Sequence, residues 1–256
     1  MGDAGRPGAS SDVTEDAFLG GRLRLRQPKR GHRAGHDAVL LAAATPAQTG
    51  QRVVEFGAGV GAAGLAVARR VSGLDLVLVE IDEALAELAR ANVALNDLAA
   101  QVVVLDVAAR PNEFTSAGLP PDSADMVLMN PPFNAASRFR SSPDKQDAHI
   151  ATDDTLAQWV HAARRILKPG GMLTLIWRAD GLADVLAVLS RGFGSLAIMP
   201  VHSAPSSPAI RIVVRATKGG RAPMELFSAL LLNNEAGNST PEARAILEGQ
   251  STLPLA

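Results

Sequence analysis

The chain has 256 residues, with 25 basic and 26 acidic side chains and a formal net charge of −1. That balance excludes a uniformly basic nucleic-acid binder such as a histone, although it permits a local basic patch. The chain contains no cysteine, which excludes disulfide frameworks, thiolate metal sites and cysteine nucleophiles, and aromatic residues make up only 4% of it.

The N-terminal region divides into a polar segment and a basic segment. Residues 1–18 are small and polar, which predicts disorder rather than a secretory signal. Residues 17–36 then hold six basic side chains and no acidic one. Within them Arg22–Arg26 alternates basic and apolar residues, which favours a short strand or one arm of a hairpin. Because an apolar helix is expected over 37–47, we describe 19–47 as a basic arm followed by a helix.

Strands and helices alternate from residue 48 to residue 218, which predicts one α/β domain with a mostly parallel sheet covered on both faces. Strands are expected at 52–56, 74–80, 101–106, 124–129, 172–177, 196–201 and 210–214, helices at 62–71, 83–96, 152–167 and 182–189, and long loops at 107–122 and 130–151. The carboxyl ends of parallel strands meet at one edge of such a sheet, where ligands bind. Residues 219–256 are predicted as a separate C-terminal extension, with a strand or helix at 224–232 and a helix capped by Thr240.

A glycine-rich turn joins the first strand of this domain to the helix that follows, in the sequence EFGAGVG at residues 55–61. Glycines at such a junction let the backbone pass close to a ligand. Residues 59–64 satisfy a dinucleotide fingerprint, whereas residues 55–61 satisfy the pattern of S-adenosylmethionine enzymes. Because the strand ends at Phe56, the glycine run begins at Gly57, which favours the second interpretation. A tight turn without a ligand is the alternative.

Two acidic residues, Glu80 and Asp106, end the next two predicted strands. An acid at the position of Glu80 suits the ribose hydroxyls of either cofactor. The carboxylate of Asp106 can accept a hydrogen bond from an adenine amine, although a solvated acid at a strand end is common. Both side chains are expected at the same crevice, which favours a shared role in binding a nucleoside.

The fourth predicted strand ends in Asn130-Pro131-Pro132-Phe133. Prolines fix φ and remove amide donors, so this turn is stiff. The side-chain oxygen of Asn130 and the carbonyl of Pro131 match a planar amine that carries two hydrogens, and Phe133 can stack on the ring that bears the amine. Two acceptors hold the nitrogen in line with a sulfonium methyl group, and this chemistry needs no metal. A rigid turn without a ligand is the alternative.

These motifs resemble those of class I S-adenosylmethionine-dependent methyltransferases that act on amines. The span 35–41 is similar to the tRNA (adenine-N6) methyltransferases, which act beside the anticodon of a valine tRNA, and the resemblance covers about residues 19–215. It implies a Rossmann-like fold with a mostly parallel seven-stranded sheet, an N-terminal arm and a C-terminal extension. It also implies S-adenosylmethionine as the cofactor and the N6 amine of an adenosine in tRNA as the target. One departure is Phe133, which stands where a tyrosine is frequent.

The resemblance also implies roles for individual residues. Those implied in cofactor binding are Asp37, Glu55, Gly57, Ala58, Gly59, Gly61, Glu80, Ile81, Asp106, Val107 and Asn130. Those implied in catalysis are Asn130, Pro131, Pro132 and Phe133. For Asp37 the alternative role is that of a helix N-cap.

Basic residues in two segments predict contact with RNA. Lys29, Arg30 and Arg33 lie in the N-terminal arm, and Arg138 and Arg140 follow the Asn-Pro-Pro-Phe turn. Phosphate contacts from such side chains dominate the affinity of proteins for nucleic acids. For the arm, a solvated cationic edge strand is an equally good interpretation, and several acidic residues dilute the charge after the turn.

Three classes of function stay open. An RNA adenine-N6 methyltransferase leads, a methyltransferase acting on protein glutamine N5 or on a small molecule comes second, and a nicotinamide-dependent oxidoreductase or a non-catalytic binding module comes third. No stretch approaches the roughly 20 apolar residues of a membrane span. We therefore expect a cytoplasmic protein with no membrane or metal partner, whose oligomeric state is open and includes a homodimer.

Overall fold

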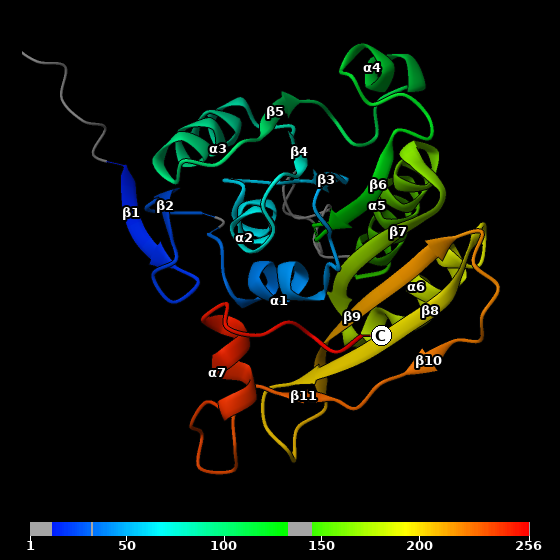
Figure 1. Cartoon of the computed structure of the whole chain (residues 1–256). Coiled ribbons are helices and arrows are strands. Elements are labelled where there is room, and N and C mark those ends of the chain that lie inside the picture. The colour runs from blue at the N-terminus through cyan, green and yellow to red at the C-terminus, as the bar shows by residue number, and fades with distance from the viewer. Residues whose placement is uncertain (1–11, 32, 133–144, 256) are drawn as a thin grey trace, which may run out of the picture.

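A large mixed β-sheet runs through the centre of the computed structural model, which describes residues 12–31, 33–132 and 145–255 (Figure 1). Its strands are β3 (Arg52–Phe56), β4 (Asp75–Glu80), β5 (Gln101–Val104), β6 (Ala124–Met129), β7 (Leu167–Arg178), β8 (Phe193–His202), β9 (Ala209–Lys218), β10 (Glu225–Leu226) and β11 (Leu230–Leu231). The helices are α1 (His36–Ala44), α2 (Ala62–Arg70), α3 (Glu83–Leu95), α4 (Pro111–Ser116), α5 (Lys145–Ile166), α6 (Leu182–Leu189) and α7 (Pro241–Leu247). A separate hairpin consists of β1 (Val13–Phe18) and β2 (Leu23–Pro28).

The strand order is β10-β8-β9-β7-β6-β3-β4-β5, and β11 also pairs with β8. The neighbours from β7 to β5 are parallel, while β9 runs antiparallel to both β7 and β8. The predicted mostly parallel sheet is confirmed, but the sheet has nine strands instead of the predicted seven, because the short strands β10 and β11 add to it beside β8. The carboxyl ends of β3, β4, β5 and β6 lie at one edge, as the sequence interpretation requires.

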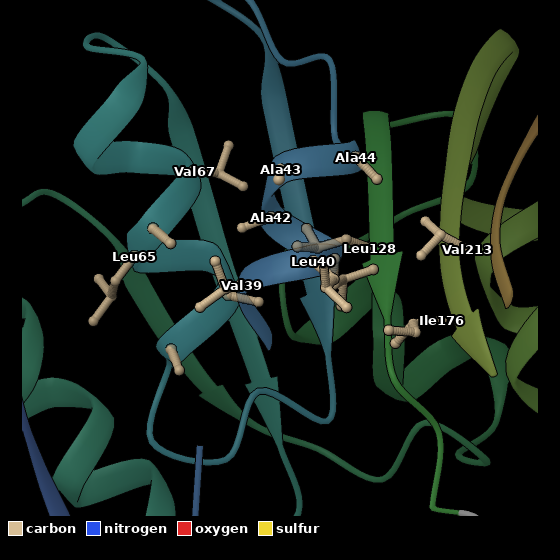
Figure 2. Packing of buried hydrophobic residues seen from close by; sticks show 14 of the residues in the cluster. Val39, Leu40, Ala42, Ala43, Ala44, Leu65, Val67, Leu128, Ile176 and Val213 are labelled. Atoms are coloured by element: carbon tan, nitrogen blue, oxygen red, sulfur yellow. The ribbon is translucent and has the colours of Figure 1, made fainter. Parts of the chain in front are cut away.

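Successive side chains of the central strands enter opposite hydrophobic cores, because a strand alternates its faces. Val53 lies in the core that α1, α2 and α7 cover, and its neighbour Val54 lies in the core that α4, α5 and α6 cover. In the first core, Figure 2 shows α1 side chains between those of α2, such as Leu65, and strand side chains, such as Leu128. Helices on both faces thus explain why the central strands are mostly apolar.

The expectation of disorder over residues 1–18 is wrong for its last part, because Val13–Phe18 forms β1 and pairs antiparallel with β2. The hairpin predicted from Arg22–Arg26 is confirmed. Leu23 and Leu25 of β2 are buried against the domain, and charged side chains also pair across the two strands. Glu15 pairs with Arg24 and, at 3.2 Å, with Arg26. The positive charge of the basic arm is therefore partly neutralised by Glu15 and Asp16, which precede the arm in the sequence.

Two predicted loops contain helix. Within 107–122, Pro111 begins the short helix α4, and its Phe114 is fully buried. Within 130–151, α5 begins at Lys145, earlier than the predicted start at residue 152. The predicted strands at 172–177, 196–201 and 210–214 are longer in the structure, because β7, β8 and β9 pair with one another over most of their length.

The C-terminal extension packs against the domain instead of standing apart. β10 and β11 add to the sheet beside β8, and α7 contacts α1. The predicted cap is confirmed, since Thr240 Oγ1 accepts a hydrogen bond from the amide of Ala243 at 3.1 Å. Leu253 donates its amide to the carbonyl of Ala43 at 3.0 Å, and Leu255 is buried.

For the ranges described above, every helix is too short or too polar to cross a lipid bilayer.

Candidate active site

A small pocket opens beside the turn between β3 and α2. Its lining residues are Ala34, Ala38, Leu41, Glu55, Gly57, Ala58, Gly59, Val60, Ala62, Ala63, Leu85 and Asn130. The structure thus brings Asn130, from the end of β6, to the same pocket as the glycine turn. Ala34, Ala38 and Leu41 reach it from the segment around α1, and composition and periodicity had not marked these three side chains as site residues.

Three glycines shape the turn through backbone conformations that other residues rarely adopt. Gly57, Gly59 and Gly61 have φ values of 64°, 56° and 86°. A Cβ atom on Gly57 would overlap the ring of Trp159, and one on Gly61 would lie 2.9 Å from Leu78 Cδ1. A Cβ atom on Gly59 would meet nothing within 4 Å. Gly59 is therefore the glycine that faces open space, whereas packing accounts for the other two.

The carboxylate of Glu80 holds this turn against the end of β4. One oxygen, Oε2, accepts a hydrogen bond from the amide of Gly59 at 2.6 Å. The other, Oε1, accepts from the amides of Ile81 and Asp82, each at 2.9 Å. A carboxylate has about four acceptor positions, so three protein bonds still leave room for one ligand hydroxyl. The predicted role on the ribose therefore fits the geometry, together with a structural role that the sequence did not indicate.

The carboxyl group of Glu55 is buried beneath the turn and accepts a hydrogen bond from the amide of Gly64 at 2.7 Å. Burial raises the pKa of Glu55 to about 8, and the nearby charge of Glu80 acts in the same direction. The hydrogen bond from Gly64 opposes this shift. At neutral pH the group is therefore mainly protonated in the structure as described, and a cationic ligand in the pocket would favour its ionised form.

The side chains predicted to hold the adenosine part of the cofactor lie outside that pocket, at the ends of β4 and β5. Ile81 is 61% exposed, which suits an apolar contact with a planar base. Asp106 is exposed, and its Oδ1 accepts a hydrogen bond from the amide of Ala108 at 2.8 Å. Val107 is buried. These placements fit a bound nucleoside, and the three roles stay predictions.

The side-chain oxygen of Asn130 is a buried acceptor for which the described residues supply no hydrogen-bond partner. A buried polar atom without a partner is costly unless a ligand or water satisfies it. Pro131 beside it is buried and Pro132 is exposed. Phe133 lies outside the described residues, so its predicted stacking role stays a prediction. In the described part of the chain no group of three or more acidic or histidine side chains could hold a metal ion.

Asp37 forms an ion pair with another residue of the protein. Its Oδ2 lies 2.9 Å from Nε of Arg211 on β9, and it is not among the residues that line the pocket. The alternative role as helix N-cap is wrong, because Gly35 occupies that position without a side-chain hydrogen bond. The ion pair joins α1 to the far half of the sheet, and the partner was not predictable because 174 residues separate the two.

The basic residues predicted to contact RNA differ in their surroundings. Arg33 donates to Asp16 on β1 at 2.6 Å and to the carbonyl of Pro28 on β2 at 2.8 Å, so its side chain bridges the two strands of the hairpin. Lys29 and Arg30 are exposed and precede Ala34 of the pocket by a few residues. Arg138 and Arg140 lie outside the described residues.

Trp159 of α5 packs against the glycine turn. Its ring meets that of Phe56 edge to face, with centroids 6.4 Å apart.

Because Trp159 packs against Gly57, substitution of Gly57 by Ala should destabilise the protein more than Gly59→Ala. Both changes strain a left-handed backbone by about 1–2 kcal/mol, but only the first adds an overlap, which costs about 1–3 kcal/mol. Urea unfolding measures the difference, and Trp159→Leu should reduce it. Equal losses in both glycine variants would contradict this packing role.

The buried carboxyl of Glu55 should make stability depend on pH. Its pKa rises from 4.5 in the unfolded chain to about 8 in the folded protein. Its contribution is therefore fully present below pH 4.5 and is lost as pH rises through the folded-state value. Glu55→Gln keeps an acceptor for Gly64 and removes the titration. As pH rises through this window, the free energy of unfolding of the variant should increase relative to that of the wild type, by up to about 1.4 kcal/mol per pH unit. Urea unfolding at several pH values measures the gap, and a gap that does not change with pH would contradict the assignment.

Comparison with known proteins agrees with this site. The family model described as methyltransferase small domain matches residues 34–202. The tRNA1(Val) (adenine(37)-N6)-methyltransferase of Musicola paradisiaca is 26% identical over 93% of this chain and 94% of that protein. The release factor glutamine methyltransferase of Gloeobacter violaceus is 34% identical over 56% of this chain and 51% of that protein. The structure of a predicted O-methyltransferase from Agrobacterium tumefaciens is 30% identical, covers 85% of this chain and 98% of that chain, and superposes with a TM-score of 0.71.

These matches confirm the predicted class I methyltransferase fold and S-adenosylmethionine as the cofactor, and they set aside the oxidoreductase and the non-catalytic module. The matched region contains both the glycine turn and Asn130. The chain is a methyltransferase and belongs to the methyltransferase small domain family.

Proposed function

We propose that this protein methylates the N6 amine of an adenosine in tRNA. The observation that carries the proposal is the buried acceptor of Asn130 beside the glycine turn, which has no partner among the described residues and which an N–H group of a ligand would satisfy. Relatives named for adenine-N6 methylation of tRNA, one of them matched over almost its whole length, favour adenosine as that donor. We expect such a substrate to be met in the cytoplasm.

The chemistry assigned to the chain is positioning and hydrogen bonding. S-adenosylmethionine supplies an electrophilic methyl group on a sulfonium. Asn130 Oδ1 accepts one N–H of the target amine, and the carbonyl of Pro131 accepts the other. The two bonds turn the nitrogen lone pair towards the methyl group. An amide is not a base, so the proton that the methylated nitrogen releases passes to solvent instead of to Asn130.

The same acceptor geometry suits the amide of a protein glutamine, and a release factor glutamine methyltransferase is among the relatives. That match covers only 51% of the relative. Glutamine N5 methylation is therefore the second candidate, and the acceptor assay separates the two.

Asn130→Ala should abolish methyl transfer to tRNA, with kcat reduced by about 100-fold or more because an aligned polar contact in the transition state is lost. Incubation with total tRNA and labelled cofactor, followed by nucleoside analysis, measures the product. Because Asn130 also lines the cofactor pocket, calorimetric titration of the cofactor is measured in parallel, and kcat is compared at saturating cofactor. Wild-type protein that labels a release factor but no tRNA would overturn the tRNA proposal. Unchanged turnover in the variant would overturn the role of Asn130.

Lys29 and Arg30 are proposed to contact tRNA phosphates near the pocket. Lys29→Glu combined with Arg30→Glu should raise the KM for tRNA by about tenfold or more at low salt and reduce the salt slope. The matched control is Arg191→Glu combined with Arg221→Glu, since both side chains are exposed and lie near the opposite edge of the sheet. Equal losses in the two charge-reversed proteins would indicate a general charge effect instead of a docking site.

A further inference from the structure

Two buried asparagines, Asn92 within α3 and Asn96 at its C-cap, connect this helix to the hairpin. They are four residues apart and so lie on the same face of the helix. Asn92 is fully buried and Asn96 is 7% exposed. Asparagine is a poor residue for the interior of a helix, so the bonds that Asn92 makes should explain its presence there.

Each asparagine pairs with the backbone of β2 as a neighbouring strand would. Asn96 accepts from the amide of Arg24 at 2.9 Å and donates to its carbonyl at 2.8 Å. Asn92 accepts from the amide of Arg26 at 2.7 Å and donates to its carbonyl at 3.0 Å. The two side chains therefore satisfy the edge of β2 that faces away from β1, and they fix the hairpin on α3.

Asn92 differs from Asn96 in one contact. Its Nδ2 also donates to the carbonyl of Val60, in the glycine turn, at 3.0 Å. Asn96 instead donates its second hydrogen to the carbonyl of Asn92, within its own helix, at 2.8 Å. The two residues thus hold the same hairpin, but one of them also holds the cofactor turn.

The bond to Val60 lies just before α2, whose N-cap is Gly61. Amides in the first turn of a helix have no acceptor within the helix, and a carbonyl before the cap lies outside the helical ladder. Here the amide of Gly64, in the first turn, donates to Glu55, and Asn92 donates to the carbonyl of Val60. The start of α2 is therefore bonded to side chains on two sides.

We propose that Asn92 is a positioning residue through which the placement of the β1–β2 hairpin controls the affinity of the glycine turn for S-adenosylmethionine. The hairpin and the turn have one side chain in common, and Val60 itself lines the pocket. A shift of β2 moves Asn92, and the Val60 carbonyl must follow it or lose its donor. Asn92 itself does not line the pocket, so it acts through the turn and not by contact with the cofactor.

The direct test compares Asn92→Ala with Asn96→Ala by calorimetric titration of S-adenosylmethionine, without RNA. Both variants lose two bonds to β2 and should lose similar stability in urea unfolding. Asn92→Ala should also weaken cofactor binding by about tenfold, the loss expected for one hydrogen bond, whereas Asn96→Ala should stay within about twofold. Asn92→Asp, which keeps the acceptor for Arg26 and removes the amide donors, provides the same comparison if the alanine variant does not fold.

A double-mutant cycle tests the link to the hairpin. Leu25, fully buried beneath the hairpin, is changed to Ala to loosen it. This change should weaken cofactor binding in the wild-type background and add nothing in the Asn92→Ala background. Additive effects, or equal cofactor affinities in the two asparagine variants, would overturn the proposal. Because these measurements use the cofactor alone, their failure is distinguishable from failure of the tRNA assignment.

Discussion

The turn between β3 and α2 is held by hydrogen bonds to side chains at peptide groups that lie before the helix or in its first turn, where the helical backbone supplies no partner. Glu80 accepts from Gly59, Glu55 accepts from Gly64, and Asn92 donates to Val60. These bonds satisfy buried peptide groups that would otherwise be costly. They also require a carboxyl group beneath the turn, and its raised pKa follows from that burial.

The rest of the architecture supports this turn from different directions. Trp159 of α5 packs on Gly57, and α3 supplies Asn92, so helices from both faces of the sheet contact it. The parallel order of β3 and β6 brings Asn130 to the same pocket. An acceptor for the substrate amine and a cradle for the methyl donor thus come from neighbouring strand ends. The sheet therefore sets their relative position, and catalysis through alignment requires such a position.

The sequence predicted what depends on local pattern. Apolar runs between helices located the strands, and the glycine run and the proline pair located the two turns of the site. What could not be predicted depends on partners far along the chain. The pairing of Asp37 with Arg211, and of Asn92 with both β2 and Val60, arises only when the elements pack. Likewise β1 seemed disordered from its composition, since its stability comes from β2 and Arg33.

Amide hydrogen exchange of the protein without cofactor tests most directly whether the turn is formed in advance. The amides of Gly59 and Gly64 donate to the carboxyl groups of Glu80 and Glu55, so they should exchange slowly before any ligand is added. Glu55→Gln should leave both protected, because its amide oxygen still accepts from Gly64. Rapid exchange at both glycines that slows only when S-adenosylmethionine is added would contradict a preformed turn.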